Sequence, residues 1–255
     1  MYNFFINNYH LNLNVISHTV ENPTACLIHV HGFLEDFNTD KAAFYNMEER
    51  IALFAPLNIV NYAIELRNHG ASTQCNLFTT KMDDYVSDLH ALVLYVQRKH
   101  PWLKIHVFAS SMGCAVSLKY AQVYGQISGL ILSAPLIGLA APLNTIANVS
   151  LVVKAFFPLG KQYCFEVELK NALKSINANA AKITIPVCAF HAKDDELTNA
   201  AATEAFMGLI SSPDKKLITF NSGQHSLLKP NTHDQDSTNL DTIKQEMYAW
   251  LTAHI

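Results

Sequence analysis

The sequence predicts one α/β domain built on a mainly parallel, doubly wound sheet, and three observations lead to this prediction. Short apolar runs alternate with longer segments of helical period along most of the chain, as in strands joined by crossover helices. Apolar residues make up 50% of the 255 residues and charged residues 15%, which excludes a disordered chain. No linker, repeat or low-complexity tract divides the sequence, so we expect residues 1–255 to form a single domain.

The first two expected strands form an antiparallel hairpin. They are short runs at Tyr2–Ile6 and Leu11–Ser17. In the second run, Leu11, Leu13 and Val15 alternate with polar residues, which is typical of a half-buried strand.

The later strands are continuous apolar runs, a pattern that suits strands buried on both faces of a sheet. They are Ala25–Val30, Ile59–Leu66, Ile105–Ala109, Gly129–Ser133, Ile183–Phe190 and Lys216–Phe220. The expected helices are Lys41–Phe54, Asp83–Lys99, Met112–Tyr124, Asn199–Ile210 and Asn239–His254. Ligands of such sheets bind beyond the carboxyl ends of the strands, so functional residues should follow the strand ends.

Charge and cysteine usage exclude several classes of function. The chain has 18 basic and 21 acidic residues, a net charge of −3, without the basic run that a nucleic-acid surface needs. The five cysteines are odd in number and lack paired metal-ligand spacing, so we expect neither disulfides nor a metal. The first ten residues do not resemble a signal peptide, and Pro142 and Lys154 interrupt the apolar stretch Leu136–Leu159. We therefore expect a cytoplasmic protein without a transmembrane segment.

The strongest catalytic signal follows the run Ile105–Ala109. Residues 110–113 read Ser-Ser-Met-Gly and lead directly into a helix, which is the strand–turn–helix context of a nucleophile elbow. An elbow needs small residues two positions to either side of the nucleophile. Ser111 has Ala109 and Gly113 there, whereas the preceding serine has large residues at both positions. We predict that Ser111 is a nucleophile; the alternative is a serine that caps the helix.

A serine nucleophile needs a base, and the base needs an acid that orients it. Asp195 lies in an acidic run after the strand predicted at Ile183–Phe190, and His225 follows the strand at Lys216–Phe220. The order Ser, Asp, His, each after a strand end, predicts a catalytic triad. Taken singly, the acidic run could be a solvated loop and the histidine an ordinary loop residue.

Acyl transfer also needs N–H donors for the oxyanion. We predict that these are the backbone N–H groups of Met112, directly after the nucleophile, and of Phe33. Phe33 follows His31 and Gly32 in the loop after an early strand, and the glycine permits a sharp turn.

These motifs resemble those of the α/β-hydrolase superfamily, in the serine-aminopeptidase-like branch that includes monoglyceride lipases and lysophospholipases. The stretch from Glu65 to Ser72 resembles the branch's Asp-Leu-Arg-Gly-His-Gly-x-Ser signature. The spacing of the branch's acid, counted from Pro186, selects Asp195 over Asp194. The chain departs from the branch in having Ala109 and Asn68 at glycine positions and Glu65 at an aspartate position.

The resemblance implies an α/β-hydrolase fold with a short helical lid, here expected at about residues 136–182. The first half of this segment, Ala140–Leu159, is apolar with Lys154 as its charged residue. It could form a roof over an acyl-chain pocket, contact a lipid interface transiently, or be an ordinary buried helix.

Together these features predict a serine ester hydrolase that uses no cofactor: a carboxylesterase, monoacylglycerol lipase or lysophospholipase with a small-molecule or lipid ester as substrate. One alternative is a peptidase or amidase on the same machinery. Another is a catalytically silent binding protein of the same fold, which Ala109 and the short lid motivate. The sequence predicts neither the preferred acyl-chain length nor the oligomeric state.

Overall fold

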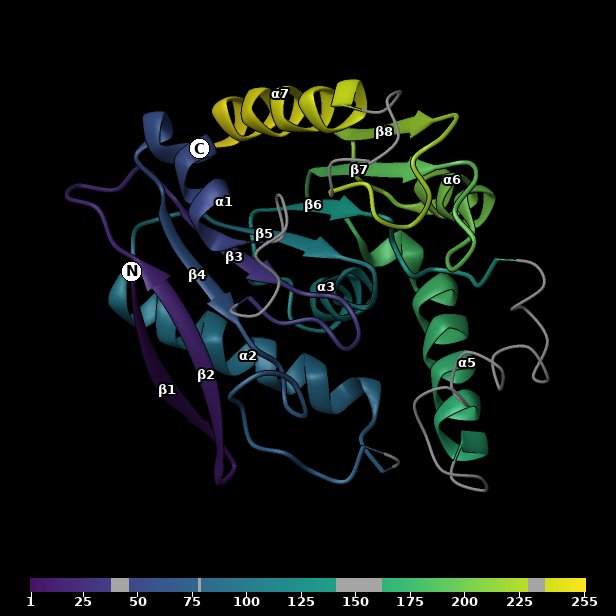
Figure 1. Ribbon diagram of the computed structural model, residues 1–255, viewed down its shortest axis with the longest axis horizontal. Coiled ribbons are helices and arrows are strands. Elements are labelled where there is room, and N and C mark those ends of the chain that lie inside the picture. The colour runs from purple at the N-terminus through teal and green to yellow at the C-terminus, as the bar shows by residue number, and fades with distance from the viewer. Residues whose placement is uncertain (38–45, 78, 141–161, 229–236) are drawn as a thin grey trace.

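The computed structural model describes residues 1–37, 46–77, 79–140, 162–228 and 237–255. Strands of these residues form one sheet of order β1-β2-β4-β3-β5-β6-β7-β8 (Figure 1). The strands are β1 (Tyr2–Asn8), β2 (Leu11–His18), β3 (Cys26–Val30), β4 (Val60–Ile64), β5 (Ile105–Ser110), β6 (Gly129–Ser133), β7 (Val187–Ala192) and β8 (Lys215–Phe220).

The strand directions confirm the predicted fold class. β1 and β2 form an antiparallel hairpin, and β2 also runs antiparallel to β4. From β4 to β8 each neighbouring pair is parallel. The carboxyl ends of β3, β5, β7 and β8 therefore lie along one edge of the sheet.

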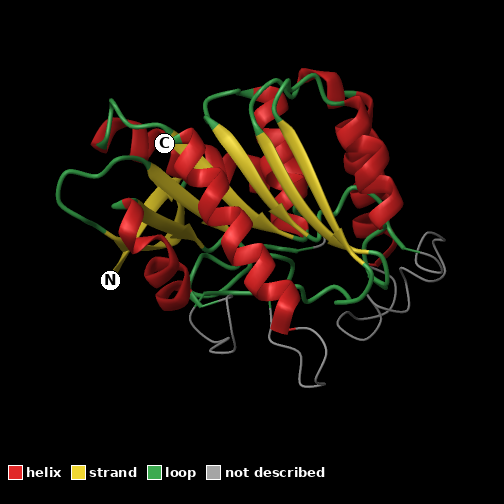
Figure 2. Ribbon diagram, turned by 90° about the horizontal axis from the view of Figure 1, so that it is seen from above, coloured by secondary structure: helices red, strands yellow, loops and turns green. Residues whose placement is uncertain are grey.

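Helices cover both faces of the sheet (Figure 2). In the described residues they are α1 (Met47–Phe54), α2 (Met82–Lys99), α3 (Met112–Val123), α5 (Gln162–Ala178), α6 (Ala200–Leu209) and α7 (Ser237–His254), with short 3-10 turns η2 (Ala55–Leu57) and η3 (Ala180–Lys182). The first part of the predicted helix Lys41–Phe54 lies outside the described residues. α1 begins at Met47, where Asn46 accepts a hydrogen bond from the N–H of Glu49 at 3.1 Å, as an N-cap should.

The two largest hydrophobic cores of the described residues form because both faces of the strands are apolar. In β3, Ile28 packs in the core beneath α2, α3 and α6, and the preceding Leu27 packs in the core beneath α1 and α7. Successive side chains of a strand point to opposite faces. A continuous apolar run is thus what a strand covered by helices on both sides requires.

β7 begins four residues later than the predicted strand Ile183–Phe190 and ends two residues later. Ile183 follows η3 and is 1% exposed, so its apolar character serves packing rather than strand pairing. Pro186 has no N–H to donate to a neighbouring strand. An apolar run in the sequence does not show which of its residues pair in a strand and which only pack in the core.

The predicted lid is described in part. Residues 141–161, and with them nearly all of its first half, lie outside the described residues. Its second half contains α5, whose residues Ala172, Leu173 and Ile176 are buried in the same core as α3. Among the helices described, none has the length and apolar character needed to cross a membrane.

Candidate active site

Ser111 occupies the turn between β5 and α3. Its φ is 50° and its ψ is −116°, a conformation that a non-glycine residue adopts only at a cost and that is common at functional sites. Both the N–H and the carbonyl of Ser111 are hydrogen-bonded. The N–H donates to the Ser133 oxygen at 3.0 Å, and the carbonyl oxygen accepts from the Leu136 N–H at 3.2 Å. The Ser111 side chain makes no capping hydrogen bond to α3, so the alternative of a capping serine is wrong.

The small residues around Ser111 have different roles. A Cβ atom on Gly113 would lie 2.5 Å from the oxygen of His31 and 2.6 Å from that of Val30, and backbone atoms at such distances cannot yield cheaply. Only glycine therefore allows α3 to start this close to β3. Ala109 is fully buried and belongs to the core under α2 and α3, where its methyl group adds apolar contact.

The structure brings the side chains of Ser111, His225 and Asp195 together. His225 Nε2 lies 2.9 Å from Ser111 Oγ, and His225 Nδ1 lies 2.9 Å from Asp195 Oδ2. A carboxylate only accepts hydrogen bonds, so Nδ1 carries the hydrogen and the Nε2 lone pair faces the serine hydroxyl. This is the arrangement in which a histidine can take the proton of a serine.

Asp195 is 7% exposed, and its carboxylate accepts five hydrogen bonds. The N–H groups of Leu197 and Thr198 donate to Oδ1 at 2.8 and 2.9 Å. Thr198 Oγ1, His225 Nδ1 and His191 Nε2 donate to Oδ2 at 2.7, 2.9 and 3.2 Å. Burial by itself raises the pKa of Asp195, but the hydrogen bonds from the two histidines and Thr198 hold it well below its usual range. The acid is therefore ionised at neutral pH.

The neighbouring Asp194 has a different function. Its carboxylate accepts hydrogen bonds from the N–H groups of Gly223 at 3.3 Å and Gln224 at 2.9 Å. It thereby ties the loop after β7 to the loop after β8, directly before His225. Of the two aspartates, only Asp195 is hydrogen-bonded to the histidine.

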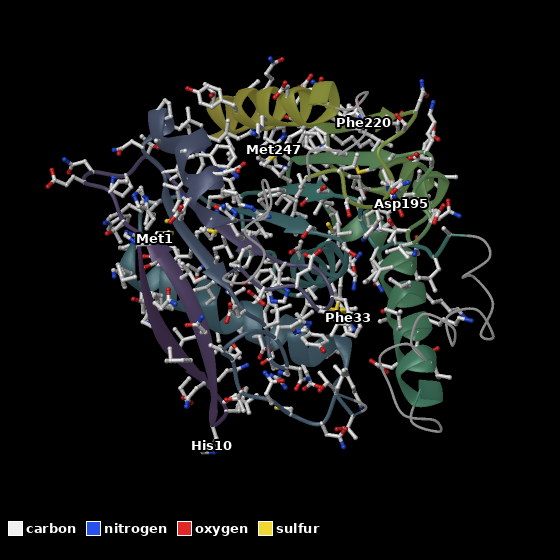
Figure 3. All side chains as sticks on the ribbon, viewed as in Figure 1. Met1, His10, Phe33, Asp195, Phe220 and Met247 are labelled. Atoms are coloured by element: carbon white, nitrogen blue, oxygen red, sulfur yellow. The ribbon has the colours of Figure 1, made fainter. Side chains whose placement is uncertain are left out.

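The two predicted oxyanion donors lie on the loops after β3 and β5. Met112 is the first residue of α3, and the first N–H groups of a helix have no acceptor within it. Phe33 follows β3; Figure 3 labels it together with Asp195, which follows β7. The Gly32 N–H donates to Glu35 Oε2 at 2.7 Å and closes the Phe33 loop. A Cβ atom on Gly32 would lie 2.8 Å from that same oxygen.

His31 fastens the Phe33 loop to the segment that follows β4. Its Nδ1 lies 2.7 Å from the Gly32 oxygen, and its Nε2 lies 3.1 Å from the Leu66 nitrogen. Burial, and then the nearby His69, lower the pKa of His31 to about 3. The ring is therefore neutral, with Nδ1–H donating to Gly32 and Nε2 accepting from Leu66.

Two residues, Leu34 after β3 and Asn68 after β4, adopt left-handed backbone conformations, and Asn68 does so where the resembled branch has glycine. Asn68 has a φ of 66°, which asparagine tolerates. Its side chain also donates to Thr80 Oγ1 at 3.0 Å. Leu34 has a φ of 59° and is 49% exposed, which is uncommon for a bulky residue. No pattern in the sequence signalled that a leucine would take this conformation.

Sequence reasoning also missed His191 and Thr198, which contact the acid from two sides. His191 ends a buried apolar run four residues before Asp195, and that position was the available signal. No group of three or more His, Cys, Asp or Glu side chains in the described ranges could hold a metal ion.

An open cavity of about 880 Å³ lies beside the acid loop. Its lining includes Ala140, Asp195, Asn199 and Glu204. Ala140 is also the first residue of the predicted acyl-chain roof, whose other residues lie outside the described ranges, so that roof stays a prediction.

Known proteins resemble this chain in sequence and in fold. The sequence profile of the serine aminopeptidase (S33) family matches residues 21–164 and 162–231. The human monoglyceride lipase is 23% identical over 71% of this chain and 71% of its own length. A monoacylglycerol lipase of Mycolicibacterium smegmatis is 22% identical over 91% of this chain and 90% of its own. The crystal structure of a Paleococcus ferrophilus monoacylglycerol lipase superposes with a TM-score of 0.75 at 16% identity, covering 95% of this chain and 99% of that one.

Proposed function

The chain belongs to the serine aminopeptidase (S33) family, and from this premise we propose that it is a serine hydrolase of carboxylic esters that acts on monoacylglycerols. The observation that carries the proposal is the continuous set of hydrogen bonds from Ser111 through His225 to the buried Asp195, at 2.9 Å in each step. The relatives support both an ester bond as the target and a lipid as the substrate, because their names are monoglyceride lipase and monoacylglycerol lipase.

In the proposed mechanism Ser111 Oγ attacks the ester carbonyl carbon while His225 Nε2 takes its proton. The N–H groups of Phe33 and Met112 stabilise the oxyanion of the tetrahedral intermediate. The intermediate collapses, His225 gives the proton to the departing alcohol, and an acyl-serine remains. Water then attacks the acyl carbon, again losing a proton to His225, and the second collapse releases the carboxylic acid and restores Ser111.

Asp195 serves this sequence by holding His225 in the correct tautomer and by stabilising its imidazolium form. Its five hydrogen bonds keep it ionised through each proton transfer. The assembled side chains give no support to a silent binding protein, and the relatives give none to a peptidase. We propose the cytoplasm as the location, because Cys26, Cys114 and Cys188 are buried and free. Contact of the lid with a lipid interface remains part of the proposal.

The test is covalent labelling with a fluorophosphonate, followed by monoacylglycerol hydrolysis. We expect one label per chain on Ser111, with labelling and turnover abolished in Ser111→Ala. Ser110→Ala is the matched control, because Ser110 is the adjacent serine and its hydroxyl points to Glu35 Oε2 at 3.4 Å. It should keep both activities. A folded wild-type protein that takes no label and cleaves no ester would contradict the proposal.

A further inference from the structure

The hydroxyl of Thr198 lies between the acid and two histidines. Its Oγ1 is 2.7 Å from Asp195 Oδ2, 3.1 Å from His191 Nε2 and 3.4 Å from His225 Nδ1. Thr198 is 2% exposed, so bulk water competes little for these contacts. The Thr198 N–H already donates to Asp195 Oδ1 and helps to hold the acid loop. The hydroxyl is not needed for that structural role.

The directions of these hydrogen bonds follow from the ionised carboxylate, which can only accept. The imidazole nitrogens that face Asp195 Oδ2 therefore both carry hydrogen. The single hydroxyl hydrogen of Thr198 makes the shortest contact, to the same carboxylate oxygen. The remaining lone pairs of Thr198 Oγ1 face the two imidazole N–H groups. Each N–H is thus shared between Asp195 and Thr198.

His191 is fixed from behind, and this fixes the hydroxyl that it faces. Its Nδ1 lies 2.9 Å from Thr203 Oγ1 on α6, and both residues are fully buried. Because Nε2 carries the hydrogen, Nδ1 accepts from the Thr203 hydroxyl in the neutral ring. A connected path of hydrogen bonds then runs from α6 to Ser111.

The backbone of Thr198 is locked as well. It forms an antiparallel bridge with Leu139, flanked by hydrogen bonds from the Ala140 N–H to the Leu197 oxygen at 3.2 Å and from the Asn199 N–H to the Gly138 oxygen at 3.0 Å. This short ladder fixes the direction of the Thr198 Cα–Cβ bond, and the hydrogen bonds of Oγ1 to Asp195 and His191 then hold the hydroxyl in the site.

The geometry points to Thr198 as a positioning residue, whose hydroxyl is a second acceptor for the Nδ1–H of His225 and keeps the Nε2 lone pair of that histidine on Ser111. The inference rests on the proposed function, because the orientation of His225 matters only if Ser111 is the nucleophile. It also has a consequence of its own. When Asp195 is removed, Thr198 still accepts the Nδ1–H, so the remaining activity should depend on Thr198.

The kinetic test measures hydrolysis of a nitrophenyl ester by Thr198→Val, Thr198→Ser, Asp195→Ala and Asp195→Ala with Thr198→Val. Thr198→Val should lower kcat roughly 10- to 100-fold, the usual worth of one hydrogen bond to a charged group, with KM nearly unchanged. Thr198→Ser should recover kcat to within about 3-fold, because it keeps the hydroxyl. Adding Thr198→Val to Asp195→Ala should cost roughly another 10-fold or more.

The matched control is Thr24→Val, which removes a hydroxyl that donates to the Leu57 oxygen at 2.6 Å, at the opposite end of β3. It should leave kcat unchanged. If Thr198→Val does not fold, as judged by its melting curve, Thr198→Ala takes its place. Equal losses in the Ser and Val variants, or a double variant no slower than Asp195→Ala, would overturn the inference.

A second measurement separates this inference from the proposed function. Imidazole ¹⁵N chemical shifts report which nitrogen of His225 carries the hydrogen, whether or not the protein cleaves esters. The wild type and Asp195→Ala should show the Nδ1–H tautomer, because Asp195 or, in its absence, Thr198 accepts that hydrogen; Asp195→Ala with Thr198→Val should show a mixture of tautomers. An inactive wild type with these shifts would defeat the proposed function and leave the role of Thr198 standing. Identical shifts in Asp195→Ala and in Asp195→Ala with Thr198→Val would defeat that role.

Discussion

The two halves of the candidate site are held in different ways. In the acid–base half, Asp195 and His225 are joined by hydrogen bonds between side chains, around a charge that stays ionised. In the oxyanion half, a neutral His31 and the carboxylate of Glu35 hold the loop that carries the proposed Phe33 N–H donor. In the first half, the reaction requires particular side chains at particular positions. The second half depends instead on the backbone conformation of its loop and on how closely α3 approaches β3.

Removing the charge from the acid–base half is the change with the largest expected effect. Asp195→Asn should lower kcat by about 10⁴-fold, because an amide can stabilise the wrong histidine tautomer. Asp194→Asn is the matched control, since Asp194 bonds to the loop N–H groups of Gly223 and Gln224 and not to His225. It should lose at most about 10-fold. Similar losses in steady-state kinetics for both variants would refute the separate roles of the two aspartates.

Crowding the oxyanion half should act on stability. Gly113→Ala places a Cβ atom 2.5 Å from the His31 oxygen, so we expect it to lower the free energy of unfolding by about 3 kcal/mol. Gly208→Ala is the control: this helical glycine has no atom within 4 Å of the added Cβ. That variant should gain roughly 0.5–1 kcal/mol. Urea denaturation of the two variants checks the pair, and an unchanged midpoint in Gly113→Ala would contradict the close approach of α3 to β3.

Lowering the pH should weaken the fold through histidines that are buried in their neutral form. Burial lowers the pKa of His31 to about 3 and that of His106 to about 4. The unfolded chain, with a histidine pKa of about 6.5, binds these protons first, so stability falls as the pH drops below that value and levels off near the folded pKa.

His106→Phe removes one of these titrating histidines. His106 packs edge-on against Trp250 and lies near the amino end of β5, opposite the end that Ser111 follows. The substitution should reduce the pH slope of the unfolding free energy by about 1.4 kcal/mol per pH unit between pH 6 and about 4. Denaturant titrations across this range measure the slope. An unaltered slope would show that His106 is not neutral when buried.

The smallest expected effect concerns Leu34 in the oxyanion half. Leu34→Gly removes a left-handed strain of about 1–2 kcal/mol and adds unfolded-state entropy of about 0.5–1 kcal/mol. The net gain should therefore lie between zero and about 1.5 kcal/mol. Leu34→Ala keeps the Cβ and the strain, so its melting temperature should stay below that of Leu34→Gly. The reverse order would argue that the exposed leucine side chain is itself stabilising.

The same contrast explains what the sequence could and could not predict. That the side chains of Ser111, Asp195 and His225 would meet was predictable, because a catalytic triad would require these residue types and each follows a strand end. The strands themselves were predictable from apolar runs, since helices cover both faces of the sheet. The late start of β7 was not, because the apolar run around Pro186 serves packing.

The left-handed conformation of Leu34 could not be read from a residue type that usually adopts other conformations, whereas Asn68 stands at a glycine position of the resembled branch, which is a signal for this conformation. Thr198 and His191 were also missed, although both contact the acid. Threonine and histidine have many uses, and only the three-dimensional arrangement shows that their polar atoms converge on one carboxylate oxygen.

The short ladder between residues 138–140 and 197–199 has a practical consequence for protein engineers. Anyone who exchanges the segment after Ala140 for that of another enzyme, to alter which esters are cleaved, should place the upstream graft junction beyond Ala140. A junction even two residues earlier would replace Leu139, which bridges to Thr198. It would then disturb the surroundings of Asp195 and His225 together with the intended specificity.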